Sequence, residues 1–130
     1  MIVTVPVSLG ELLDKIAILE IKERRITDDG RLAHVRTELA SLREARDATL
    51  AELSASVPTA LIEELARINA ALWDVEDQLR ECERRQDFGE HFVALARSVY
   101  LTNDRRARVK NDINKLLSST LVEVKSYASY

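Results

Sequence analysis

Apolar residues recur every three to four positions through most of the chain, which is the spacing of one face of an α-helix. The most regular run lies between residues 61 and 82, where steps of four and three alternate, a pattern typical of coiled-coil-like packing. Its members are Leu61, Leu65, Ile68, Leu72, Val75, Leu79 and Cys82. The same periodicity predicts helices over about residues 8–25, 29–53, 59–85 and 87–118.

Signals for helix ends and turns separate these four segments. Ser8-Leu9-Gly10-Glu11 and Asp87-Phe88-Gly89-Glu90 both match the capping box, in which a side-chain oxygen and a carboxylate three residues later each satisfy a free backbone amide. The short link 54–59, which contains Pro58, favours an antiparallel hairpin between the second and third helices. Residues 2–7, IVTVPV, alternate and are β-branched, which predicts a short extended arm. In the tail, Leu121, Val122 and Val124 are candidates to pair with this arm.

We therefore predict an all-α fold, with residues 1–130 forming a single helical domain. It would be a four-helix antiparallel bundle with a long helical hairpin, a short extended N-terminal arm and a C-terminal tail. The low content of Gly (three) and Pro (two) and the 46% of hydrophobic residues agree with a helical protein that has a core. The first helix is apolar on two sides, because Ile18 and Ile21 lie opposite its main stripe. Such a helix is usually central in the fold or covered by a second chain. We expect a second copy to cover that side, giving a homo-oligomer, most simply a two-fold dimer.

Composition limits the partners and the compartment. A net charge of −3 gives no overall attraction to nucleic acid or to an anionic membrane, so neither is expected as a partner. Cys82 is the single cysteine, which fits a reducing compartment. No apolar run approaches the length of a membrane span, and the N-terminus lacks the features of a secretory signal. We expect a cytoplasmic protein. His34 and His91 are on different predicted helices without zinc-ligand spacing, so no metal site is assigned.

The apolar stripe of the fourth helix changes character along its length. It begins with phenylalanine, leucine and valine and continues, at the same helical phase, into Asn103, Arg106, Lys110 and Asn114. Buried charges are costly unless they are paired and hydrogen-bonded, so this end of the helix needs polar partners. The stripe of the first helix similarly ends on Glu20 and Glu23. A mixed stripe on the third helix carries Trp73 and Glu76, and Tyr100 lies near the polar end of the fourth.

These residues support three hypotheses. In the first, the protein is a small binding or accessory protein with an anion-accepting pocket between helices 1, 3 and 4. Arg106 and Lys110 would contact the anion, Asn103 and Asn114 would hydrogen-bond it, and Glu20 and Glu23 would hold the cations. Glu76, Trp73 and Tyr100 would support this site. In the second hypothesis the protein is a metal-dependent phosphohydrolase in which the carboxylates of Glu20, Glu23 and Glu76 bind Mg²⁺. In the third the cluster is a purely structural ion network in a helical adaptor.

The second hypothesis comes from a resemblance. Glu20-x-x-Glu23 and Asp74-x-x-Asp77 are similar to the acidic pairs of the all-helical nucleotide pyrophosphatases, which bind magnesium on adjacent helices. This resemblance implies a metal-dependent phosphohydrolase that uses Glu20, Glu23 and Glu76. The chain departs from that pattern because Asp74 lies away from the apolar stripe of its helix. The stretch between the two pairs is also longer than in that family. The sequence leaves open whether the protein is an enzyme.

A second resemblance covers nearly the whole chain. The opening VPVSLGELLDKIAILEIKERRI, the stretch from ALWDVEDQLRE to NDINKLL and the ending VEVKSYASY resemble a family of small bacterial proteins of unknown function. The matching features include Leu72-Trp73, Tyr100, Asn103-Asp104-Arg105-Arg106, Asn114 and Lys125-Ser126-Tyr127. This resemblance implies a bacterial, cytoplasmic, helical protein, and it implies no activity or site residues.

Overall fold

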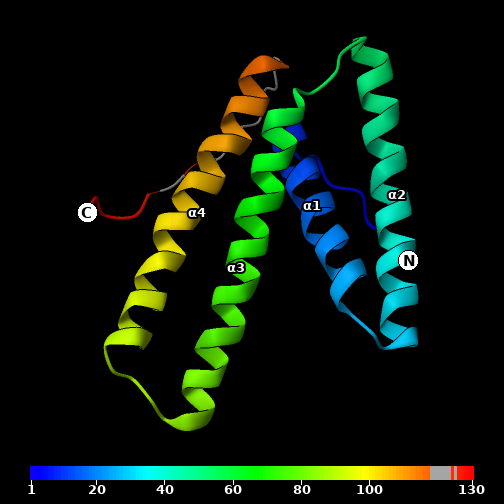
Figure 1. Cartoon of the computed structure of the whole chain (residues 1–130). Coiled ribbons are helices and arrows are strands. Elements are labelled where there is room, and N and C mark those ends of the chain that lie inside the picture. Colours follow the sequence, from blue (N-terminus) through cyan, green and yellow to red (C-terminus); the bar gives the residue numbers. More distant parts are fainter. Residues whose placement is uncertain (118–123, 125) are drawn as a thin grey trace.

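The structure is a computed structural model that describes residues 1–117, 124 and 126–130. It contains helices α1 (Leu9–Arg25), α2 (Asp29–Leu53), α3 (Thr59–Arg85) and α4 (Glu90–Leu116) (Figure 1). The predicted all-α fold with four helices is confirmed. Ser8 caps α1 as predicted, with its hydroxyl oxygen accepting a hydrogen bond from the Glu11 amide at 3.1 Å. The capping box predicted at Asp87 is wrong, because its carboxylate accepts from the Gly89 amide instead and α4 begins at Glu90.

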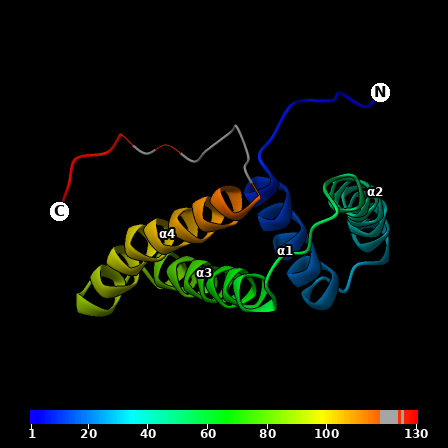
Figure 2. The ribbon, with the colours of Figure 1, turned by 90° about the horizontal axis from the view of Figure 1, so that it is seen from above.

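Helix α1 lies at the centre of the fold. On one side it packs against α2, and on the other it packs against both α3 and α4, which form a long antiparallel hairpin (Figures 1 and 2). Among the four described helices, α2 contacts α1 alone. The hairpin predicted between α2 and α3 is therefore wrong, although the link between them is short. Because α1 has two apolar sides, it packs between α2 and α3, and these two described helices do not contact each other.

The core extends to both sides of α1. Leu13 and Leu19 belong to one side, Ala17 and Ile21 belong to the other, and all four are buried. Ile21 is only 1% exposed, and Ile18 is half-buried. The side of α1 that we assigned to a second copy is thus buried within the chain itself, against α3 and α4. The stated reason for a dimer through α1 is wrong, while the oligomeric state stays a prediction.

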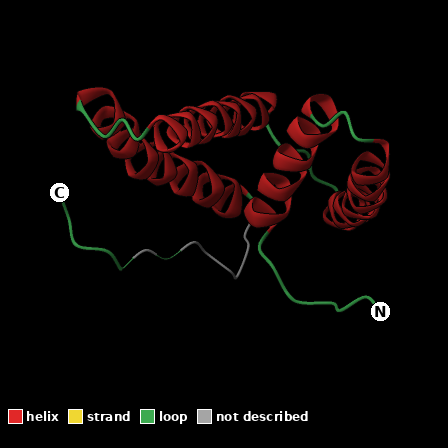
Figure 3. Ribbon diagram, turned by 90° about the horizontal axis from the view of Figure 1, so that it is seen from below, coloured by secondary structure: helices red, strands yellow, loops and turns green. Residues whose placement is uncertain are grey.

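The N-terminal arm extends away from the helices, whereas residues 127–130 lie along the outer face of α4. The N-terminal arm and residues 126–130 lie on the same side of the helices, toward opposite ends of the molecule (Figures 2 and 3). Residues 1–8 form neither helix nor strand. Of the tail residues proposed to pair with the arm, Leu121 and Val122 lie outside the described residues, and Val124 is exposed. Within the described ranges, none of the helices is long and apolar enough to cross a membrane.

Candidate functional site

A buried charge network joins α1 to α4. Lys110 reaches from α4 to the N-terminal half of α1, where its Nζ lies 2.6 Å from Oε2 of Glu11 and 3.8 Å from Oδ2 of Asp14. The side chains of Lys110 and Asp14 are only 8% and 5% exposed. Both charges are therefore largely removed from water, and each depends on the other for compensation.

The network continues into α3 through Asn69. Its Nδ2 donates to Oδ1 of Asp14 at 2.9 Å and to the carbonyl oxygen of Leu65 at 3.0 Å. Its Oδ1 accepts from Nη1 of Arg106 at 3.3 Å. We name Glu11, Asp14, Asn69, Arg106 and Lys110 the polar cluster. It connects three helices, and both of its cations already have partners in the protein.

Asn114 holds the start of α1 against α4. Its Oδ1 accepts a hydrogen bond from the Gly10 amide at 2.8 Å, and the residue is 1% exposed. Its buried Nδ2 has no hydrogen-bond partner among the described residues. A Cβ on Gly10 would lie 2.4 Å from the carbonyl oxygen of Lys110. The two helices therefore approach closely enough here that only glycine fits without a shift of backbone.

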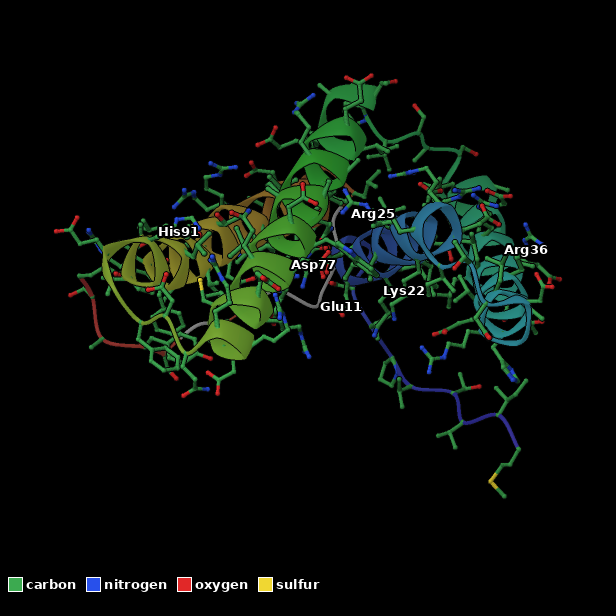
Figure 4. The ribbon with its side chains drawn as sticks, turned by 60° about the horizontal axis from the view of Figure 1, so that its bottom comes forward. Glu11, Lys22, Arg25, Arg36, Asp77 and His91 are labelled. Carbon is green, nitrogen blue, oxygen red and sulfur yellow. The ribbon has the colours of Figure 1, made fainter. Side chains whose placement is uncertain are left out.

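The predicted carboxylates lie elsewhere. Glu20 binds Arg43 of α2 at 3.1 Å, and the carboxylate of Glu23 lies 3.7 Å from the guanidinium of Arg36, also on α2. Glu76 is exposed on α3. Figure 4 shows Glu11 on the side of α1 toward the α3–α4 hairpin, whereas Arg36 lies beyond α1 on α2. The expectation that Glu20 and Glu23 hold Lys110 and Arg106 is wrong, since the stripe that carries these glutamates faces α2.

The described residues also contain no group of three or more His, Cys, Asp or Glu side chains placed to hold a metal ion. The structure therefore does not bring together Glu20, Glu23 and Glu76, the three carboxylates that the phosphohydrolase hypothesis requires.

The remaining predicted site residues are dispersed. Trp73 is half-buried beside α1, where the guanidinium of Arg25 lies 5.8 Å from its ring centroid. Arg25 also pairs with Asp74 at 2.5 Å. Asn103 is half-buried on α4, and its side chain makes no hydrogen bond to another described residue. Tyr100 lies on the outer face of α4 and belongs to a different feature, described next.

A groove runs between the outer face of α4 and the C-terminal residues. The groove is open to solvent and has a volume of about 800 Å³. The lining residues are Tyr100, Asp104, Ala107, Arg108, Asn111, Tyr127, Ala128, Ser129 and Tyr130. We name this feature the tail groove. The hydroxyl of Tyr130 hydrogen-bonds to Oδ2 of Asp104, and its ring lies 5.4 Å from that of Tyr100 at an angle of 51°.

The sequence analysis does not predict the tail groove. Residues 100, 104, 108 and 111 are spaced to share one helix face, which was the available signal. The face is polar, however, and resembled an ordinary solvated surface. Its counterpart, residues 127–130, is distant in sequence, so helical periodicity could not place it there.

The contact between Tyr130 and Asp104 predicts a pH dependence. The hydrogen bond to the carboxylate is the main cause that raises the pKa of Tyr130 above its ordinary value of 10.0. Because the pKa is raised in the folded protein, the contact is fully present below about pH 10 and is lost as the pH rises through the higher folded value. Phenolate absorbance should show one of the three tyrosines titrating late, and Asp104→Asn should move that titration to lower pH. An unchanged titration in Asp104→Asn would contradict the contact.

Comparison with known proteins gives one match. A family model described as a family of unknown function (DUF6165) matches residues 3–130, which include the polar cluster and both sides of the tail groove. No curated protein and no solved structure matches the chain. The chain belongs to this family of unknown function, DUF6165.

Proposed function

We propose that the protein binds a small molecule in the tail groove, and that this molecule carries a ring and an anionic group. The observation that supports this is the set of side chains that line one groove: three tyrosine rings, a guanidinium, a carboxylate and an amide. The groove volume of about 800 Å³ lies within the range of small-molecule sites, about 300–1,000 Å³. Such sites typically combine apolar or aromatic walls with a few polar groups that fix orientation.

Each side chain has a distinct role in this proposal. The rings of Tyr100 and Tyr130 offer flat surfaces on which a ligand ring can stack. Arg108 is exposed and makes no hydrogen bond or ion pair with another described residue, so its planar guanidinium is available for a carboxylate or phosphate. Asp104 and Asn111 also line the groove and have partners within the protein, and Asp104 accepts the hydrogen bond that holds the ring of Tyr130 beside that of Tyr100.

The polar cluster fits a different role. An anion that bound Lys110 would have to displace Glu11 and Asp14, and it would leave Asp14 buried without its countercharge. We therefore assign the polar cluster the structural role of holding α1 against the α3–α4 hairpin. The anion-accepting function predicted for Arg106 and Lys110 is transferred to Arg108.

The test measures thermal unfolding against nucleotides, nucleotide sugars, sugar phosphates, carboxylates and divalent metals. A ligand at 100 times its dissociation constant adds about 2.7 kcal/mol, or roughly 3–6 °C in Tm for a domain of this size. The expected result is a shift for one anionic class that Arg108→Ala abolishes. Arg105→Ala is the matched control, because Arg105 is exposed on the same helix and does not line the groove.

Two outcomes would contradict the proposal. A shift of the same size in Arg108→Ala would place the ligand elsewhere, and the absence of any shift across the panel would remove the binding function. Magnesium-dependent release of phosphate from a nucleotide would favour the phosphohydrolase hypothesis instead.

A further inference from the structure

Among the described residues, the N-terminal arm is the most exposed apolar segment. Ile2, Val3, Val5 and Val7 are 92%, 74%, 62% and 40% exposed, so none of them packs into the core. The backbone groups of residues 1–7 make no hydrogen bond to another described residue. The arm therefore presents both apolar side chains and unpaired backbone groups to solvent.

This combination is typical of a strand without a partner. β-Branched residues favour strands, and an extended segment with unpaired amides is a template for pairing with another chain. The described part of the chain contains no strand, so the arm has no sheet edge there to join. We propose that residues 2–7 pair antiparallel with the same residues of a second copy of this chain.

Pro6 decides which edge of the arm can pair. In an extended strand, backbone groups of successive residues point to opposite edges, so residues 2, 4 and 6 share one edge and residues 3, 5 and 7 share the other. Proline has no N–H and is tolerated only where that group would face away from the partner. The pairing edge is therefore that of Val3, Val5 and Val7.

This edge is self-complementary. An antiparallel pair centred on Val5 places Val5 opposite Val5 and Val3 opposite Val7, twice by symmetry. Every hydrogen-bonded pair then sets valine against valine on one face, a favourable cross-strand combination. If the pair were instead centred on Thr4, Pro6 would lie in the row of residues that hydrogen-bond to the partner strand. Because proline has no N–H, one backbone hydrogen bond would then be lost. This self-complementarity favours a second copy over an unrelated sheet edge.

The valine face also needs a surface to cover, because an isolated two-stranded ribbon is only marginally stable in water. The arm leaves the body next to Gly10, which is held by Asn114 of α4. Leu116, two residues further along α4, is 58% exposed. Apolar surface is thus present at the end of the molecule where the two arms would pair.

The experiment compares Val5→Pro with Thr4→Pro in the full chain. Proline at position 5 removes an amide that faces the partner, whereas proline at position 4 removes one that faces outward, as Pro6 already does. Sedimentation equilibrium over a wide concentration range should show a monomer–dimer equilibrium for wild type and Thr4→Pro. Val5→Pro should be monomeric at the same concentrations. At concentrations low enough for all three proteins to be monomeric, circular dichroism should show equal helicity and Tm, since the arm lies outside the core.

Several outcomes would overturn the proposal. A wild type that stays monomeric throughout excludes arm pairing. Equal dimerisation of Val5→Pro and Thr4→Pro would place the dimer contact elsewhere. Loss of the dimer in both variants would contradict the antiparallel register centred on Val5, because in that register the amide of Thr4 faces away from the partner and its replacement by proline should be tolerated. None of these results depends on the tail groove, so the proposed binding function stands or fails separately.

Discussion

Replacing Lys110 by methionine is expected to lower the free energy of unfolding by about 3–5 kcal/mol, the usual cost of removing one partner from a buried ion pair. Methionine keeps most of the length and apolar volume of the lysine side chain, so the loss reports charge more than volume. Without the ammonium group, Asp14 keeps its hydrogen bond from Asn69 but loses its countercharge while only 5% of its side chain is exposed. Urea unfolding at neutral pH measures the difference.

Two further variants distinguish the loss of the buried ion pair from a loss of stability that any lysine substitution on α4 would cause. Lys115→Met changes an exposed lysine on the same helix and should alter stability by no more than about 0.5 kcal/mol. Asp14→Asn added to Lys110→Met should recover part of the loss, because it removes the uncompensated charge. If Lys110→Met and Lys115→Met were equally stable, the polar cluster would not hold the fold together.

Substituting Gly10 by alanine is expected to destabilise the protein by about 1–3 kcal/mol or more, the range found for overpacked cores. The added Cβ would lie 2.4 Å from the Lys110 carbonyl oxygen and 2.9 Å from Oδ1 of Asn114. The first contact is with backbone, so α1 and α4 must separate, and the hydrogen bond from the Gly10 amide to Asn114 would weaken with them. Thermal unfolding followed by circular dichroism would report the change as a lower Tm.

Gly30→Ala is the control for this substitution. Gly30 lies in the first turn of α2, where a Cβ would meet Oδ2 of Asp28 at an ordinary 3.5 Å. Alanine is better than glycine in a helix by roughly 0.5–1 kcal/mol, so this variant should be neutral or more stable. A Gly10→Ala protein as stable as Gly30→Ala would show that the close approach of α1 to α4 is not required.

Most of the fold was predictable from local pattern. The 3.6-residue periodicity locates the four helices, and the two apolar sides of α1 anticipate its central position. Which helix packs against which was not predictable in the same way. Periodicity shows which face of a helix is apolar, but it does not show which other helix covers that face. The stripe with Glu20 and Glu23 was assigned to the wrong partner for this reason. Their counterions, Arg43 and Arg36, are on α2.

The candidate site was predictable only in part. The stripe on α4 correctly indicates that Lys110 and Asn114 are buried. Lys110 is compensated by the carboxylates of Glu11 and Asp14. These two residues lie on the opposite side of α1 from the stripe that ends on Glu20 and Glu23. The tail groove depends on residues 127–130 lying against α4, a long-range arrangement that leaves no periodic signal in the sequence.

We assign a structural role to the polar cluster and ligand binding to the tail groove. The most direct measurement is the ligand-induced change in Tm for wild type, Lys110→Met and Arg108→Ala, tested against the same anionic compounds. We expect a shift of similar size in wild type and Lys110→Met, although the latter unfolds at a lower temperature, and no shift in Arg108→Ala. A shift that survives in Arg108→Ala and disappears in Lys110→Met would contradict this assignment and would place the anion at the polar cluster.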